Sequence, residues 1–169
     1  VNGQGTAASI GYDYSRIAII NGELEDLDIT GESSIASFSL SHPLRADAGR
    51  LLYGYSGVNI KESETDFGNV DSFKTSVRSL FLGAEYQAFG RGYVLSARPS
   101  LNIGFDRFGG DRSFSIFNAD VGALVNLGEA HEVIVRLRGQ LSDTDLLPAM
   151  EQFQLGGVAT VRGYREGVM

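Results

Sequence analysis

The sequence predicts an all-β fold, an antiparallel meander of about seven long strands. Three observations support this class. Apolar and polar residues alternate with a period of two along most of the 169-residue chain. The alternating segments are mostly longer than the roughly 5–6 residues of an ordinary strand and reach the about 9–11 residues that a tilted membrane strand needs. The connections between these segments alternate between long and short.

The alternation is clearest in residues 93–105, where Leu95 and Leu101 share one face and Ser96 and Ser100 share the other. A residue that points to one face of a strand is followed by one that points to the opposite face, so each segment has an apolar and a polar side. The same pattern predicts strands at residues 7–20, 33–42, 50–61, 76–88, 93–105, 114–127 and 132–142.

Two irregularities interrupt the pattern. In the third segment, Tyr53 and Tyr55 are out of phase with Val58, which predicts a bulge near Gly57. Pro99 lies inside the best segment and lacks a backbone N–H, which predicts an edge position or a bulge there.

The lengths of the connections predict that the two ends of the sheet differ, one carrying long loops and the other tight turns. Long connections are expected at 21–32, 62–73, 106–112 and after residue 143, and tight turns at 43–49, 89–92 and 128–131. Because consecutive connections fall at opposite ends of a meander, all the long ones lie at one end. Short turns at one end and long loops at the other are typical of outer-membrane barrels. The first two long connections are also rich in Asp and Glu.

Composition excludes several classes of protein. The net charge is −7 and the isoelectric point about 4.8, which argues against a nucleic-acid partner. The chain contains no cysteine and only two histidines, His42 and His131, and neither has a partner at a useful spacing. Asp and Glu are plentiful, but no spacing singles out one pair as acid and base. We therefore predict no catalytic residues, no metal site and no cofactor.

The two faces of the predicted strands need different surroundings. The apolar face requires either a second sheet or lipid, so outer-membrane lipid is one expected partner. The polar face is too charged for a dry core and suits a water-filled lumen. Its candidate lumen-facing residues are Arg98, Arg136, Arg138 and Asp120. The arginines either form a basic stripe for a polypeptide or balance acidic side chains, and the second reading is favoured.

The distinctive segment lies near the end of the chain, within the expected loop 143–169. Gly156 and Gly157 allow a sharp reversal of the backbone. Gly163 allows close approach beside Arg162, whose planar guanidinium suits bidentate pairing with a carboxylate. Tyr164 offers a ring for packing and a hydroxyl for hydrogen bonding.

This segment resembles the signature of the two-partner secretion transporters, the hemolysin secretion-activation type of outer-membrane protein. The resemblance lies in Glu151-Gln-Phe153, in Leu155-Gly156-Gly157, in Val161-Arg162-Gly163-Tyr164 and in Glu166-Gly167. The Val-Arg-Gly core is shared with the related barrel-assembly insertases, whereas the flanking Glu-Gln-Phe and Glu-Gly favour secretion. Weaker likeness extends over the rest of the chain.

The resemblance implies a concrete architecture. The chain would be a fragment of a sixteen-stranded outer-membrane β-barrel, contributing its fifth to eleventh strands. The Val161–Tyr164 motif would belong to a long loop that folds back into the lumen, supported by Glu151, Phe153, Gly156 and Gly157. The aspartate that pairs with the loop arginine in the family lies on a later strand, which is not in this sequence. We expect the sequence to be a piece of a longer protein.

The resemblance also implies a function. The parent would secrete or activate an exported partner polypeptide, of the hemolysin or adhesin type, across the bacterial outer membrane without nucleotide. Such transport requires no chemistry, so no enzyme activity is expected. Two alternatives remain open at this point. One is an outer-membrane assembly insertase of the same superfamily, and the other is a soluble β-sandwich or lipocalin-like binding module.

Overall fold

The computed structural model describes residues 5–18, 29–67, 70–128 and 131–153, and the backbone alone at 70 and 71. Seven strands form one sheet in chain order: β1 (Ala7–Ala18), β2 (Ile29–Asp47), β3 (Arg50–Phe67), β4 (Val70–Gly90), β5 (Tyr93–Phe105), β6 (Phe114–Asn126) and β7 (Glu132–Ser142). Every neighbouring pair is antiparallel. A short 3₁₀ turn, η2 (Ala149–Glu151), follows β7. The all-β antiparallel meander predicted from the sequence is confirmed.

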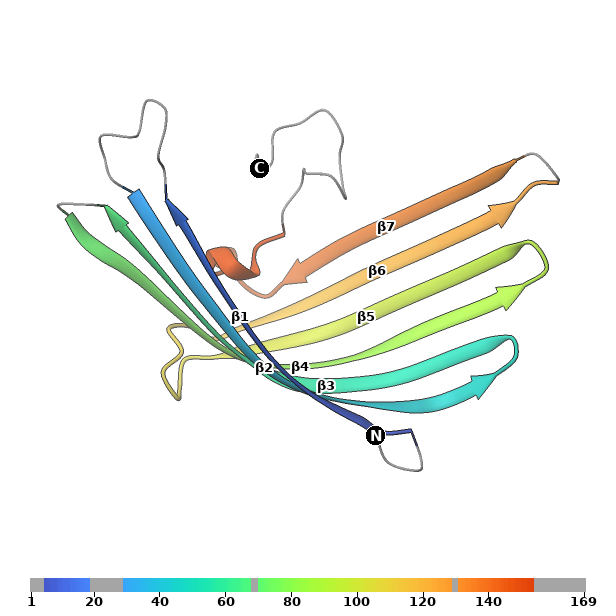
Figure 1. Cartoon of the computed structure of the whole chain (residues 1–169), viewed down its shortest axis with the longest axis horizontal. Helices are drawn as coiled ribbons and strands as arrows, with labels where there is room; N and C mark the ends of the chain where they lie inside the picture. Colours follow the sequence, from blue (N-terminus) through green and yellow to red (C-terminus); the bar gives the residue numbers. More distant parts are fainter. Residues whose placement is uncertain (1–4, 19–28, 68–69, 129–130, 154–169) are drawn as a thin grey trace.

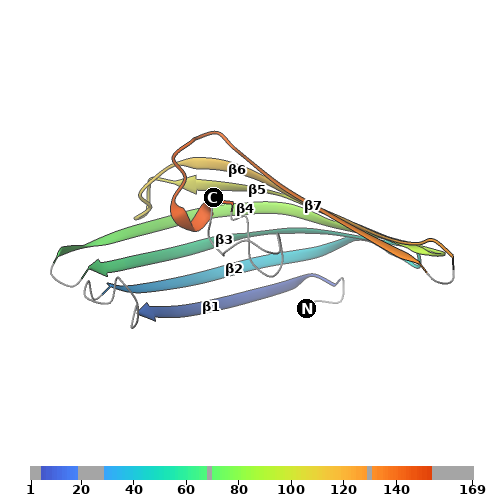
Figure 2. The ribbon, with the colours of Figure 1, turned by 90° about the horizontal axis from the view of Figure 1, so that it is seen from above.

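The sheet is strongly curved and encloses a hollow on one side (Figure 1). Seen from above, the strands lie side by side in a single layer, with η2 inside the hollow (Figure 2). The connections at 48–49 and 91–92 lie at one end of the sheet, opposite the connection at 106–113 and the segment after β7. No helix in the described part of the chain is long and apolar enough to span a membrane.

The strands β2, β3 and β4 are longer than the sequence pattern predicts. The expected long connection at 62–73 is wrong, because β3 continues to Phe67 and β4 starts at Val70. The expected turn at 43–49 is likewise mostly strand, since β2 runs to Asp47. The expected connection at 21–32 shrinks too, because β2 starts at Ile29, although residues 19–28 lie outside the described part.

A row of charged side chains crosses these extensions in place of an apolar face. Arg16, Glu32, Glu64 and Lys74 are register partners across β1 to β4. Ion pairs join the outer members, with Arg16 Nε 3.5 Å from Glu32 Oε1 and Lys74 Nζ 3.7 Å from Glu64 Oε2. Opposite charges facing each other across strands support pairing without any apolar alternation. Hydrophobic periodicity therefore misses this part of the sheet.

The predicted bulge near Gly57 is wrong. Pairing of β3 continues without a shift through Ser39–Gly57 on one side and Gly57–Phe81 on the other. The register shifts lie instead between Pro43 and Arg45 and between Thr65 and Phe67. The tyrosines are out of phase because they face the hollow.

Glycines make room for aromatic rings on the hollow side. The Tyr55 ring covers Gly83 on β4, and the Phe81 ring covers Gly57 on β3, so a Cβ at either glycine would overlap the ring. Aromatic rings that cover strand glycines compensate for the side chain that glycine lacks.

Pro99 sits in an interior strand without a bulge. It pairs with Ala119 on β6, while the ladder with β4 is interrupted between Gly83–Ser100 and Tyr86–Ala97 with the register unchanged. The expectation of an edge position or a bulge is therefore wrong. The sheet tolerates proline by a local gap in the ladder, and Tyr55 donates its hydroxyl hydrogen to the Pro99 carbonyl, O···O 3.4 Å.

The convex face of the sheet is apolar and uncovered. Leu82, Leu101, Phe117 and Leu141 form one row across β4 to β7. They are between 39% and 71% exposed. Within the described residues the only buried apolar side chains are Val77, Ala88, Phe114, Ile116 and Pro148. A soluble sandwich or lipocalin would bury such a row, so neither alternative fits this single layer.

Candidate functional site

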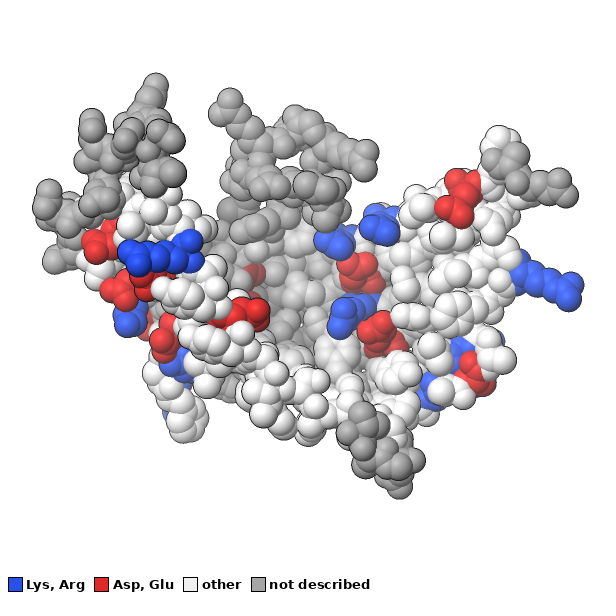
Figure 3. All heavy atoms as spheres, viewed as in Figure 1, with Lys and Arg blue, Asp and Glu red and all other residues white. Residues whose placement is uncertain are grey.

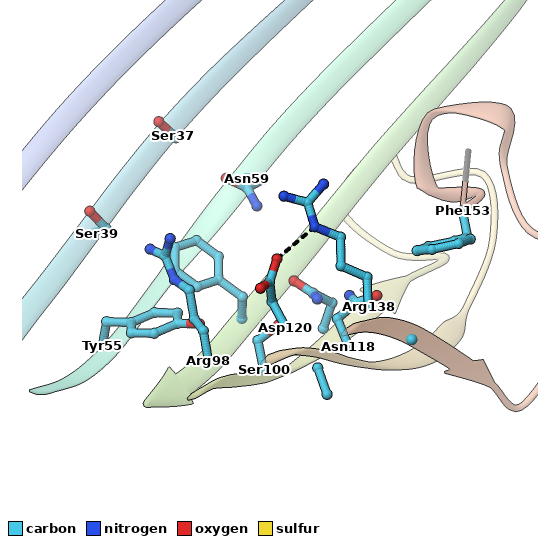
Figure 4. Close-up of a pocket in the computed structure, with 14 residues that line it drawn as sticks. Ser37, Ser39, Tyr55, Asn59, Arg98, Ser100, Asn118, Asp120, Arg138 and Phe153 are labelled. Carbon is cyan, nitrogen blue, oxygen red and sulfur yellow. Dashed lines mark hydrogen bonds and ion pairs between the residues drawn. The ribbon is translucent and has the colours of Figure 1, made fainter. Parts of the chain in front are cut away.

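The concave face of the sheet holds a cavity of about 560 Å³ (Figure 4). Residues from six strands, β2 to β7, line it, because alternate positions of each strand point to this side. Most of the lining is polar: Ser37, Ser39, Asn59, Arg98, Ser100, Asn102, Asn118, Asp120 and Arg138. Tyr55, Phe81 and Phe153 add aromatic surface.

A charged row crosses the floor of this cavity. Arg98, Asp120 and Arg138 are register partners on β5, β6 and β7. Arg138 Nε donates to Asp120 Oδ2 at 2.7 Å, drawn as a dashed line in Figure 4. Arg98 Nε lies 3.9 Å from Glu85 Oε2, and its guanidinium lies 5.3 Å from the centre of the Tyr55 ring. Positive and negative groups thus lie close together within the hollow (Figure 3).

This pattern is that of a hydrated wall. Arg138 and Asp120 keep 45% and 44% of their side-chain surface exposed, and Arg98 keeps 62%. Exposed charges, hydroxyls and amides can exchange hydrogen bonds with water or with a passing polar chain. Among the described residues no three His, Asp or Glu side chains are placed to hold a metal ion.

The exposure of the Asp120–Arg138 pair leads to a prediction. Asp120→Asn is expected to lower the free energy of unfolding by less than about 1 kcal/mol, because exposed ion pairs contribute little. Denaturant unfolding of the folded barrel in detergent would measure it. A loss of several kcal/mol would show that the pair is a structural bond and not part of a wet wall.

The segment after β7 folds back over the same face. Leu147 packs on Val77, Phe114 and Ile116, which are at most 3% exposed. Phe153, two residues beyond η2, reaches the cavity near Arg138 (Figure 4). The chain therefore returns into the hollow after the last strand.

Glu151 is held at both its side chain and its backbone. Lys61 Nζ donates to Glu151 Oε1 at 2.7 Å, and Gln140 Nε2 donates to the Glu151 carbonyl at 3.0 Å. Lys61 comes from β3 and Gln140 from β7, so this residue links two distant strands across the hollow.

The structure brings together part of the site expected from the sequence. Arg98, Asp120 and Arg138 share one row, and Arg136 lies on β7 opposite Gly122. Glu151 and Phe153 also face the hollow. The remaining predicted residues lie outside the described part of the chain: Gly156, Gly157, Val161, Arg162, Gly163 and Tyr164.

Sequence reasoning missed Lys61 and Tyr55. Tyr55 is hard to find from the sequence, because an aromatic residue on the polar face of a strand looks like a break in the alternation of apolar and polar residues. Lys61 could have been found, since it lies two and six residues after Asn59 and Tyr55 on the same face of β3. Its partner Glu151 is 90 residues away, and no local pattern links the two.

Comparison with known proteins places these features in a family. The model of the family described as haemolysin secretion/activation protein ShlB/FhaC/HecB matches residues 3–169, which is nearly the whole chain. The chain belongs to this family. The resemblance noted at the signature residues is thereby confirmed. No curated protein matches the sequence.

A solved structure shows the same fold. CdiB from Acinetobacter baumannii superimposes with a TM-score of 0.73 over 93% of this chain, at 20% sequence identity. The chain spans about 30% of the length of CdiB. As a part of an outer-membrane secretion/activation protein, the chain forms transmembrane β-strands in the outer membrane. The uncovered convex face is the side suited to lipid, and the concave face is the inner wall.

Proposed function

We propose that the chain is the central part of a pore that secretes or activates an exported partner polypeptide, of the hemolysin or adhesin type, without nucleotide. In this proposal the seven strands are the fifth to eleventh of a sixteen-stranded barrel. The observation that supports it most is that one single-layered sheet has an exposed apolar convex face, suited to lipid, and a polar, charged concave face, suited to water. Such a wall suits the passage of a polar chain and supplies no chemistry of its own.

The family favours secretion over the insertase alternative. The matching family is that of secretion/activation proteins, and the match includes the Glu-Gln-Phe and Glu-Gly residues that flank the shared motif. The partner would accordingly be a secreted polypeptide and not another membrane barrel.

We further propose that Arg162 and Tyr164 latch the loop to the inner wall, with Val161 and Gly163 shaping its tip and Gly156 and Gly157 its reversal. The guanidinium of arginine suits a bidentate carboxylate partner, and such charge-assisted bonds are among the strong ones. The return of the chain into the hollow after β7 supports this proposal.

Arg162→Ala, made in the gene that encodes the chain, is expected to lower secretion of the partner polypeptide at least about tenfold, because a charged hydrogen bond worth about 1.5–3 kcal/mol is lost. Barrel insertion should be retained. Secretion is measured by immunoblot of the medium, and insertion by heat-modifiable mobility of the outer-membrane fraction.

Two further variants sharpen the test. Arg162→Lys keeps the positive charge but loses the planar guanidinium that can donate two hydrogen bonds to one carboxylate. Its secretion should therefore be as low as that of Arg162→Ala. Arg91→Ala, an exposed arginine in a tight turn, is the matched control and should secrete normally. Normal secretion by Arg162→Ala would refute the latch.

A further inference from the structure

We propose that Lys61 is a positioning residue for the loop that follows β7. Through Glu151 it fixes the base of that loop to the inner wall. The chain that leads to the Val161–Tyr164 motif therefore begins at a fixed position. The inference rests on the proposed secretion function for its consequence, although its geometry can be tested separately.

The ion pair between Lys61 and Glu151 differs from the others in the described part of the chain. Its two side chains are only 17% and 11% exposed, whereas in each other pair at least one partner is 43% exposed or more. Low exposure reduces screening by water and salt, so a pair of this kind is far more costly to break than a surface pair. The short distance of 2.7 Å marks a charge-assisted hydrogen bond.

The same short segment is held from several directions. β3 binds the Glu151 carboxylate through Lys61, and β7 binds its carbonyl through Gln140. Within the segment, Gln152 Nε2 donates to the Leu147 carbonyl at 3.1 Å. Leu147 itself packs on the buried cluster on the wall. A segment with anchors on two strands and an apolar contact between them is a fixed base and not a hinge.

Fixing the base matters for the motif further along the chain. Arg162 follows Glu151 by 11 positions but follows Ser142, the end of β7, by 20. If the base detaches, the free chain that must find its partner nearly doubles in length. The entropy of closing that longer loop alone lowers the latched population about 2.5-fold. Leaving a low-exposure lysine without its carboxylate adds to this loss.

Amine labelling tests the geometry directly. The chain contains two lysines, Lys61 and Lys74, and the Lys74 side chain is 62% exposed. In the protein assembled in the outer membrane, with residue-resolved mass spectrometry, an amine-reactive ester should modify Lys61 at least about tenfold more slowly than Lys74, because the ion pair must open first. Glu151→Gln should remove most of that protection. Equal labelling of the two lysines in the unmodified protein would overturn the proposal.

Secretion tests the positioning role. Lys61→Met should lower export several-fold with insertion retained, and the exchange Lys61→Glu with Glu151→Lys should restore it. Lys74→Met is the matched control and should export normally. Normal export by Lys61→Met, or failure of the exchange to restore export, would overturn the role.

A cross-link separates a fixed base from a moving one. The chain has no cysteine, so Lys61→Cys with Glu151→Cys creates a unique pair. A bis-thiosulfonate cross-linker, whose spacer makes up for the length of the lost lysine and glutamate side chains, should join the two cysteines. Export should continue, because the base does not move. Export that stops on cross-linking and returns on reduction would contradict the fixed base. If the cross-link and labelling behave as expected but Arg162→Ala exports normally, the proposed latch fails and the geometry of Lys61 stands.

Discussion

Leu101→Arg destabilises the barrel by about 2–4 kcal/mol, whereas Ser100→Arg, one residue away, is tolerated. This is the expected result because the two side chains face opposite sides of β5. Leu101 lies between Leu82 and Phe117 on the convex face, and Ser100 lines the cavity. An arginine near the middle of a lipid-facing strand has a cost of this size, while a lumenal substitution changes mainly the properties of the pore.

Reversible unfolding from lipid vesicles in urea would measure the difference between these two variants. Leu101→Met is the control for size, since it keeps an apolar side chain on the convex face. Equal destabilisation by both arginines would mean that both faces of β5 are buried in apolar surroundings.

Ile116→Ala is expected to lower the free energy of unfolding by about 2–5 kcal/mol, the usual cost of truncating a buried isoleucine. Ile116 is fully buried and lies in the cluster of Val77 and Phe114 on which Leu147 packs. Ile134 offers a matched control, because its side chain is 57% exposed, and Ile134→Ala should cost less than about 1 kcal/mol.

The same variant bears on the segment after β7. A cavity under Leu147 weakens its packing, so Ile116→Ala should also raise the rate at which Lys61 is labelled. Equal stability of the two alanine variants would show that the segment does not cover Ile116 in the membrane protein.

Local patterns predicted the strands where one face meets lipid. In β5, β6 and β7 the apolar face is continuous, and the structure places these strands within one residue of their predicted bounds. The extended ends of β2, β3 and β4 were missed because polar residues occupy both faces there. Those ends carry the charged row from Arg16 to Lys74, whose neighbours across the strands depend on the register.

The candidate site was predictable only in part. Arg98, Asp120 and Arg138 each fall on the polar phase of a strand, so their common face follows from alternation. That they form one row depends on the lengths of two turns, which set the register. The contact of Lys61 with Glu151 joins β3 to a segment beyond β7, and only the curvature of the whole sheet brings them together.

The central claim is that the sheet separates lipid from a water-filled lumen, and a cysteine scan along β5 tests it most directly. Single cysteines are introduced from Leu95 to Ile103 into the otherwise cysteine-free chain, and the intact outer membrane is treated with a small, water-soluble maleimide. Cysteines at 96, 98, 100 and 102 should react, and those at 95, 97, 101 and 103 should stay protected. Reaction at all positions alike, or at the apolar set, would contradict the account.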